Sequence, residues 1–166
     1  MTKGIVSGVV SNMVTLRVDG PVLQGEICYI TTGGDRLMAE VIKVVGSDVY
    51  VQVFESTRGL KVGSQAEFTG HQLEIQLGPG MLSKNYDGLQ NDLDKMDGVF
   101  LRRGQYTAPL DEDRLWDFEP IVKAGDRVQG SDWLGKVEEN HQPLKIMAPF
   151  QMEGTAVVKS IVPSGQ

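Results

Sequence analysis

The sequence has little cysteine and little histidine. Cys28 is the single cysteine in 166 residues, so neither an internal disulfide nor a cysteine-rich zinc site can form. The two histidines, His71 and His141, lie far apart and lack the clustered spacing of a metal-binding motif. We therefore expect surface histidines, no metal site and a reducing, cytoplasmic setting.

Long apolar runs and an excess of basic residues are also missing. The apolar run around residues 41–45 is far shorter than the roughly 20 residues that span a bilayer. The first residues do not resemble a signal peptide, which has a basic region, an apolar stretch and a cleavage site. With 22 acidic and 16 basic residues, the net charge of −6 repels phosphate backbones. Direct membrane insertion and nucleic-acid binding are therefore not expected.

Glycine, in contrast, is abundant, and it separates short apolar runs. Residues 14–18 and 73–77 alternate apolar with polar side chains, which predicts half-buried strands. β-Branched runs at residues 36–45 and 49–54 flank Gly46, Ser47 and Asp48, the composition of a hairpin turn. Short strands with no neighbouring helix to cover their edges favour closure into a barrel. The predicted fold is therefore mostly β, with a small antiparallel barrel over residues 1–77.

Two further regions follow this predicted barrel. A connector over residues 78–110 begins with strand-breaking glycine and proline, and then places Leu89, Leu93 and Met96 at helical spacing. We expect these to form a short helix that Gly98 ends. Residues 111–166 return to strand-like patterns, with two apolar halves around a polar stretch at 138–142. This pattern predicts two facing hairpins.

The sequence GSDWLGKV, residues 130–137, is the nearest approach to a phosphate-binding loop. Val137 stands where Mg²⁺ binding needs a serine or threonine hydroxyl, and strand-like residues follow where a helix should begin. Trp133 and Leu134 would also crowd an anion. We therefore interpret this segment as a β turn.

Three other groups of residues could form sites, and each has a simpler interpretation. An acidic cluster, Asp111, Glu112 and Asp113, is typical of a solvated turn or a helix start. Three large aromatic residues are expected to pack in the core rather than to stack on bases: Trp116, Phe118 and Trp133. A Ser-His-Asp or Cys-His arrangement stays open, because such groups converge only in the fold. We predict no catalytic, cofactor-binding or metal-binding residue.

Four stretches resemble subunits of the rotary ATPases. The end of their N-terminal barrel is similar to residues 51–63 (VQVFESTRGLKVG). The catalytic A subunits of the V/A type have stretches similar to residues 77–90 (LGPGMLSKNYDGLQ) and 102–111 (RRGQYTAPLD). The insertion that distinguishes A subunits from B subunits is similar to residues 116–139 (WDFEPIVKAGDRVQGSDWLGKVEE). The chain is similar to this family over nearly its whole length.

The resemblance implies a parent subunit that makes or hydrolyses ATP, coupled to proton or sodium transport at the cytoplasmic face of a membrane. ATP or ADP and Mg²⁺ would bind on a nucleotide domain beyond Gln166, because no GxxxxGK[ST] motif occurs here. The barrel would contact B subunits, and the insertion would meet peripheral-stalk or regulatory subunits. The sequence departs from the family where Asn91 and Asp92 replace an Arg-Pro pair, and where a Gly-Pro is missing between residues 9 and 12.

The two apolar halves of the last region also resemble biotinyl and lipoyl carrier domains, which implies a barrel-sandwich-hybrid shape. In those carriers the modified lysine lies at the tip of the turn between the halves. Residues 139–142 occupy that turn here, and Lys145 comes later, in a predicted strand. A carrier module is therefore the alternative to an assembly module, and a third possibility is a barrel that binds oligosaccharide or nucleic acid on one face.

Overall fold

The computed structural model describes residues 2–96 and 103–165, and these residues form two compact units. The first unit comprises Met1–Ile75 and Met96–Tyr106, and the second comprises Gln76–Lys95 and Thr107–Gln166. The chain therefore leaves the first unit, contributes to the second, and returns once before it finishes in the second. The boundaries predicted from the sequence, after residues 77 and 110, stay a prediction.

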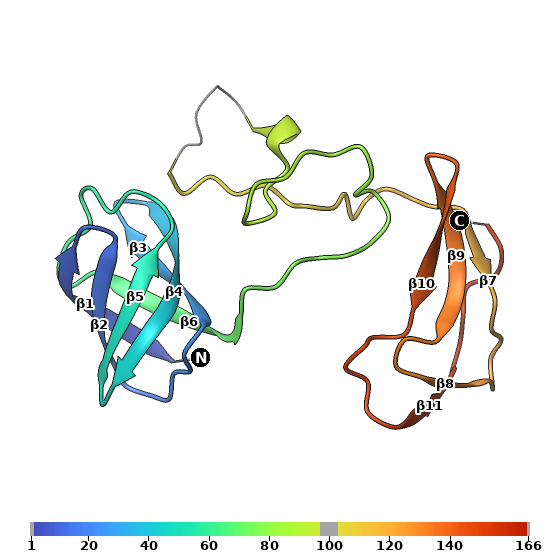
Figure 1. Cartoon of the computed structure of the whole chain (residues 1–166), viewed down its shortest axis with the longest axis horizontal. Coiled ribbons are helices and arrows are strands. Elements are labelled where there is room, and N and C mark those ends of the chain that lie inside the picture. Colours follow the sequence, from blue (N-terminus) through green and yellow to red (C-terminus); the bar gives the residue numbers. More distant parts are fainter. Residues whose placement is uncertain (1, 97–102, 166) are drawn as a thin grey trace. The chain divides into compact units, whose positions relative to one another are not determined.

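The first unit contains a closed antiparallel barrel, as predicted (Figure 1). Its strands are β1 (Lys3–Val10), β2 (Met13–Val18), β3 (Glu26–Thr32), β4 (Asp35–Val45), β5 (Asp48–Val53) and β6 (Gln65–Gln72). They are hydrogen-bonded in the order β1-β2-β5-β4-β3-β6, and β1 pairs with β6 to close the sheet. Closure removes the free strand edges that six short strands would otherwise expose.

Period-two alternation places one set of apolar side chains inside the barrel. Val14 and Leu16 of β2 are fully buried, as the sequence pattern predicted, and Phe68 of β6 packs in the same core. The predicted hairpin joins β4 to β5 through a turn that contains Gly46, whose φ is 60°. A side chain at Gly46 would be strained, because left-handed backbone conformations favour glycine. The barrel fold thus follows directly from its local sequence.

The strand predicted at residues 73–77 is wrong. Strand β6 ends at Gln72, where its pairing with Glu26 of β3 is the last register position, and Leu73, Ile75 and Leu77 are exposed. Beyond that point the neighbouring strand offers no backbone partner, so alternation alone cannot form a sheet. The backbone of Gln76 instead bonds to the side chain of Gln90: its N–H donates to Oε1, and its carbonyl oxygen accepts from Nε2.

The helix predicted from Leu89, Leu93 and Met96 is also wrong, apart from one turn. The described connector contains only the 3₁₀ turn η1 (Leu93–Lys95), and Gly98 lies outside the described residues. Asp87 accepts the backbone N–H groups of Leu89 and Asn91, and Gln90 has a φ of 60°. The Asp87 side chain thus accepts backbone N–H groups that would otherwise bond to carbonyl groups within a helix. Asp and Asn side chains commonly compete with helix formation in this way.

The last part of the second unit is built from two small sheets. One has the order β10-β9-β7, formed by β7 (Phe118–Pro120), β9 (Trp133–Glu139) and β10 (Gln142–Met147). The other pairs β8 (Arg127–Gln129) with β11 (Thr155–Val157). The prediction of two facing hairpins is therefore only partly right, because β9–β10 is a hairpin but β8 pairs across the two halves with β11.

The backbone at Gly130 and Ser131 explains this pairing. Ser131 has a φ of 72°, and the chain turns a corner between β8 and β9 instead of folding into a tight hairpin. A Cβ at Gly130 would lie 3.0 Å from the carbonyl oxygen of Phe150, so the two halves approach closely at this corner. In the described part of the chain, no helix is long and apolar enough to cross a membrane.

Candidate functional site

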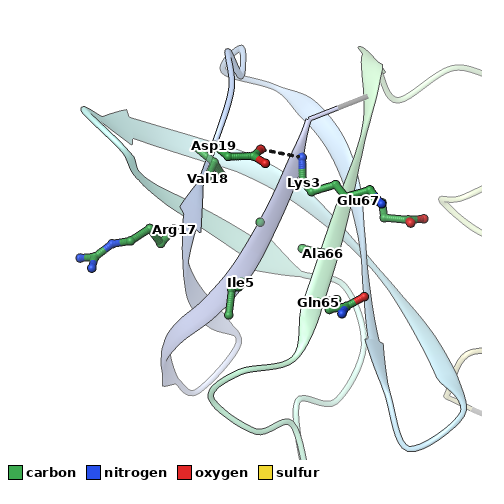
Figure 2. Close-up of a pocket in the computed structure, with 9 residues that line it drawn as sticks. Lys3, Ile5, Arg17, Val18, Asp19, Gln65, Ala66 and Glu67 are labelled. Atoms are coloured by element: carbon green, nitrogen blue, oxygen red, sulfur yellow. Dashed lines mark hydrogen bonds between the residues drawn. The ribbon is translucent and has the colours of Figure 1, made fainter.

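The barrel carries a shallow hollow across β2, β1 and β6 (Figure 2). Its volume is about 350 Å³, and Ile5 of β1, which is 55% exposed, lies between Arg17 of β2 and Gln65 of β6. Lys3 donates its backbone N–H to Asp19 at 3.2 Å at one end of the hollow. An apolar side chain bordered by charges of both signs suits a protein contact better than a small-molecule reaction.

A second exposed apolar surface lies at the far end of the β4–β5 hairpin. The β-bulge between Val41 and Lys43 changes which side of β4 faces the core, and Ile42, Val44 and Val45 are all exposed. Exposed apolar residues that gather on one hairpin are typical of surfaces that contact another protein. The barrel thus offers contact surfaces outside its filled core.

In the second unit, the most distinctive cluster is a buried group of three consecutive polar residues. Gln90, Asn91 and Asp92 are 8%, 5% and 0% exposed. Buried polar groups destabilise a fold unless they are hydrogen-bonded. Each of the three is bonded to a different segment of the chain, and they therefore act as an organising centre of the connector.

The side chains of Gln90 and Asn91 join the two ends of the connector. Gln90 bonds both backbone groups of Gln76 at 2.7 Å, on the outgoing segment. Asn91 accepts the N–H of Thr107 at 3.0 Å, on the returning segment, and donates to Asp87 at 2.8 Å. Because backbone bonds of this kind are directional, they fix the path of segments that have no sheet partner.

Asp92 gives this centre its charge. Lys84 Nζ lies 2.8 Å and Lys95 Nζ 3.8 Å from Asp92 Oδ2, and the backbone N–H of Asp94 donates to Oδ1. The hydrogen bond from Lys84 lowers the pKa of Asp92, against the effect of burial, and the same bond raises the pKa of Lys84. Burial alone would raise the pKa of Asp87, but hydrogen bonds from Asn91 and Leu89 lower it overall.

The returning segment is fastened to the barrel in the first unit. The hydroxyl of Tyr106 donates to Glu55 and accepts the backbone N–H of Met38 at 2.9 Å, while its ring packs edge to face on Tyr29. Burial raises the pKa of the Tyr106 hydroxyl, and the Glu55 carboxylate raises it further. Arg103 Nε lies 3.4 Å from Asp35. Tyr106 therefore stays protonated and fixes where the chain leaves the barrel.

The near-match to a phosphate loop is a corner followed by strand β9, as the sequence predicted. Val137 is buried within β9, and Lys136 is ion-paired with Glu119 at 2.8 Å. The hydrogen bond and charge of Glu119 raise the pKa of Lys136. This backbone cannot wrap a phosphate, because that needs a loop leading into a helix N-terminus.

The histidines and the acidic cluster lie at the surface, as predicted. His71 and His141 are both exposed, and each lies within 4.0 Å of a single carboxylate. Asp111 to Asp113 form an exposed turn in which Asp111 accepts the N–H of Asp113 at 3.2 Å. Among residues 2–96 and 103–165, no group of three or more His, Cys, Asp or Glu residues could hold a metal ion.

The expectation that the three large aromatic residues pack in the core is wrong for Trp133 and only partly right for the other two. Trp133 is 49% exposed, and Trp116 and Phe118 are half-buried. Both tryptophan rings carry a cation instead. Lys145 Nζ lies 3.4 Å from the Trp133 ring centre, and the Arg114 guanidinium lies 4.0 Å from that of Trp116. A cation over the ring lets an indole stay partly solvated.

The same contact argues against the carrier alternative. Strands β9 and β10 are joined by a turn at Asn140 and His141, and Lys145 lies inside β10 opposite Lys136. A lysine that carries a swinging cofactor must project from the tip of the turn, whereas Lys145 lies over Trp133. Lys145 therefore does not occupy the position that carrier chemistry requires.

Sequence reasoning missed the polar centre at Gln90–Asp92. One signal was present: Asn91 and Asp92 lie inside the predicted helix, and Asp87 lies just before it. Side chains of this type favour turns and local backbone bonding. Their long-range partners, Gln76 and Thr107, could not be found without the fold.

Comparisons with known proteins agree with this architecture. Residues 6–70 match the family model described as ATP synthase alpha/beta family, beta-barrel domain. Residues 107–166 match the model described as ATPsynthase alpha/beta subunit barrel-sandwich domain. The first range covers the closed barrel from within β1 to within β6, and the second contains both small sheets.

Curated relatives match nearly the whole chain. It is 45% identical over 167 residues to the V-type ATP synthase alpha chain of Borreliella afzelii (strain PKo), covering 99% of this chain and 29% of that protein. It is 44% identical to the protein of the same name from Treponema denticola, covering 99% and 28%. The chain thus spans less than a third of the length of these relatives, and the carrier alternative finds no support among them. It belongs to the ATP synthase alpha/beta family, as the N-terminal part of a V-type ATP synthase alpha chain.

Proposed function

We propose that this segment is the assembly and subunit-contact part of a V-type ATP synthase alpha chain. The whole subunit would synthesise or hydrolyse ATP, coupled to the transport of protons or sodium ions. ATP or ADP and Mg²⁺ would bind outside this segment, which itself takes no cofactor. The complete complex would hold the subunit at the cytoplasmic face of a membrane.

The observation that carries this proposal is the exposed apolar surface of the barrel. The hydrophobic core is filled, yet Ile5 on β1 and Ile42, Val44 and Val45 on β4 are at least 38% exposed. Such a surface suits contact with the equivalent barrel of a B-type subunit. Subunit interfaces bury apolar side chains at their centre, and a rim of polar residues surrounds that centre. The barrel-sandwich domain would meet a peripheral-stalk or regulatory subunit.

Assembly can be tested by mixing the chain with the purified B-type subunit of the same complex. Size-exclusion chromatography with light scattering is expected to detect a heteromeric complex. Val44→Glu should weaken it by at least about tenfold, because a charge would be buried at the interface. Leu115→Glu, at an exposed position of the second unit, is the matched control. A complex of unchanged stability with Val44→Glu and with a matching Ile5→Glu variant would overturn the assignment of the barrel surface.

Nucleotide binding is the second test. Isothermal titration of the chain with Mg-ATP is expected to give no saturable heat. Saturable micromolar binding would contradict the proposal that this segment contributes assembly contacts and no nucleotide site. Full-length subunit from the same source is the positive control, because it should bind Mg-ATP under the same conditions.

A further inference from the structure

The connector contains a strained residue directly before Lys84, the lysine that compensates the charge of Asp92. Ser83 has a φ of 62°, which places its backbone in the left-handed region. Residues other than glycine, asparagine and aspartate seldom adopt this conformation. It persists only where neighbouring contacts hold the backbone in place. In the second unit, the turn that joins β9 to β10 supplies those contacts.

Two side chains at the tip of the β9–β10 hairpin bond to the residues around this strained position. Glu139, the last residue of β9, accepts the backbone N–H of Leu82 on Oε1 at 3.0 Å. Asn140, the next residue, donates its side-chain N–H to the hydroxyl of Ser83 at 3.0 Å. The hairpin tip therefore holds both of the residues that immediately precede Lys84.

Glu139 is a buried carboxylate without a counter-ion. It is 4% exposed, and within residues 2–96 and 103–165 no basic side chain lies within ion-pair distance of it. Burial of a carboxylate is costly unless hydrogen bonds compensate it, so the bond from Leu82 matters for both partners. Strand β9 pairs with β10 on one side and with β7 on the other. The sheet thus fixes Glu139, and Glu139 in turn holds the connector.

The position of Lys84 depends on this turn. Its Nζ lies 2.8 Å from Oδ2 of Asp92, whereas Nζ of Lys95 is farther away, at 3.8 Å. If Ser83 relaxed to a right-handed conformation, the direction of the chain at Lys84 would change. Asp92 would then lose its shorter ion pair while its side chain stayed buried, which is unfavourable. The hairpin tip and Asp92 are therefore expected to be energetically coupled, although they do not touch.

We propose that the tip of the β9–β10 hairpin is a latch on the connector: it holds residues 82–83 so that Lys84 stays on Asp92, and its displacement breaks that ion pair. Glu139 is a positioning residue in this latch, because it acts on Asp92 through the backbone of Leu82 and through Lys84. The inference goes beyond the proposed function and does not depend on which subunit the chain contacts.

The latch can be reached from solvent. Glu138 and His141, which flank the two latch residues of the tip, are both exposed. Any contact that moves the tip would therefore act on the connector as well, although the polar centre of the connector is itself buried. The latch would thus transmit a change at the surface of the barrel-sandwich domain to the interior of the second unit.

The pKa of Asp92 tests this route, and it can be measured from the chemical shift of its carboxyl carbon between pH 7 and pH 2. Glu139→Ala is expected to raise this pKa, as Lys84→Met should, because the hydrogen bond from Lys84 normally lowers it. Removal of a nearby negative charge alone would instead lower the pKa. Glu139→Gln removes the charge but keeps an acceptor for Leu82, so it should not raise the pKa. An unchanged or lowered pKa in Glu139→Ala would overturn the latch.

Glycine substitutions in the hairpin turn provide a matched pair. Asn140 and His141 have φ angles of 49° and 62°, so glycine can replace either residue without backbone strain. Asn140→Gly removes the bond to Ser83 and should accelerate amide hydrogen exchange at Leu82 by at least about threefold. His141→Gly makes the same change one residue later and should leave that rate within about twofold of the parent value. Equal rates in the two variants would show that the connector does not depend on the tip.

A double-mutant cycle at pH 7 keeps the test decisive if the second unit unfolds in acid. Urea denaturation gives the factor by which Glu139→Ala raises the unfolding equilibrium constant. This factor should be at least about threefold smaller in a Lys84→Met background, where the ion pair is already lost. Glu138→Ala, at the exposed neighbouring position, should have the same small effect in both backgrounds. An equal effect of Glu139→Ala in the two backgrounds would mean that Glu139 does not act through Lys84, and the proposal would fail.

Discussion

At the scale of single residues, Asp92 shows how this chain stabilises a segment that has almost no regular structure. Its side chain is fully buried, yet the two lysines that compensate its charge are themselves partly solvated. This arrangement keeps the lysines hydrated while the carboxylate accepts their hydrogen bonds. It avoids the larger desolvation cost of burying both members of an ion pair.

Asp92→Asn is expected to lower the free energy of unfolding of the second unit by about 1–3 kcal/mol at pH 7, because a charge-assisted bond is lost. The pKa of Asp92 is lowered from 3.8 in the folded state, so its contribution is complete above that value and is lost as the pH falls through the folded pKa. Urea unfolding between pH 7 and pH 2 should therefore show the difference shrinking below about pH 4. Asp113→Asn, an exposed control in the same unit, should match the parent chain. A difference that persists unchanged at pH 2 would contradict the role of the charge.

Tyr106 supports a second prediction for a single residue. Tyr106→Phe removes the hydroxyl that bonds both Glu55 and the N–H of Met38, while it keeps the ring on Tyr29. The barrel unit should lose about 1–2 kcal/mol of unfolding free energy. Tyr50→Phe removes an exposed hydroxyl of β5 and should change stability by less than about 0.5 kcal/mol. Equal denaturation midpoints for the two variants would show that the Tyr106 hydroxyl contributes nothing.

At the scale of elements, the barrel strands were predictable because each pattern agrees with its environment. Residues 14–18, 36–45 and 49–54 have both the alternation or β-branching of strands and partners on each side. Residues 73–77 have the same alternation but no strand to pair with, and residues 89–96 have helical spacing but local aspartate bonds that compete. Local patterns thus give a correct prediction where tertiary pairing supports them and fail where it does not.

Candidate interaction surfaces were less predictable than the fold. An exposed tryptophan and a buried aspartate both run against ordinary preference, and only their partners explain them: Lys145 for Trp133, and Lys84 for Asp92. Those partners come from other turns or strands, so sequence spacing does not reveal them.

Strand β9 gives a prediction at this scale, because Gly135 lets β7 approach it closely. A Cβ at Gly135 would overlap the ring of Phe118 and lie 2.7 Å from the carbonyl oxygen of Glu119. Gly135→Ala should therefore destabilise the second unit by about 1–3 kcal/mol through overpacking. Gly88→Ala is the matched control, since a Cβ there meets no atom within 4 Å. Circular dichroism melts compare the two, and a Gly135→Ala protein as stable as Gly88→Ala would refute this account of the strand contact.

At the scale of the whole molecule, the two units are stabilised by different means. The first unit has a continuous apolar core of strand residues, whereas the second relies on two small sheets and a buried polar centre. Solvent conditions that weaken hydrogen bonds and ion pairs should therefore affect the units unequally. This division fits a chain whose two family matches, to residues 6–70 and 107–166, are separate domain models.

Differential scanning calorimetry is accordingly expected to resolve two unfolding transitions. Leu16→Ala, which empties part of the barrel core, should lower one midpoint, with a cost of about 2–5 kcal/mol. Gly135→Ala should lower only the other. In the double variant the two shifts should add within about 0.5 kcal/mol, because sites with no shared partner behave independently. A single transition that both substitutions move together would mean that the two units unfold as one cooperative body, and the separate stabilisation argued from their interiors would be wrong.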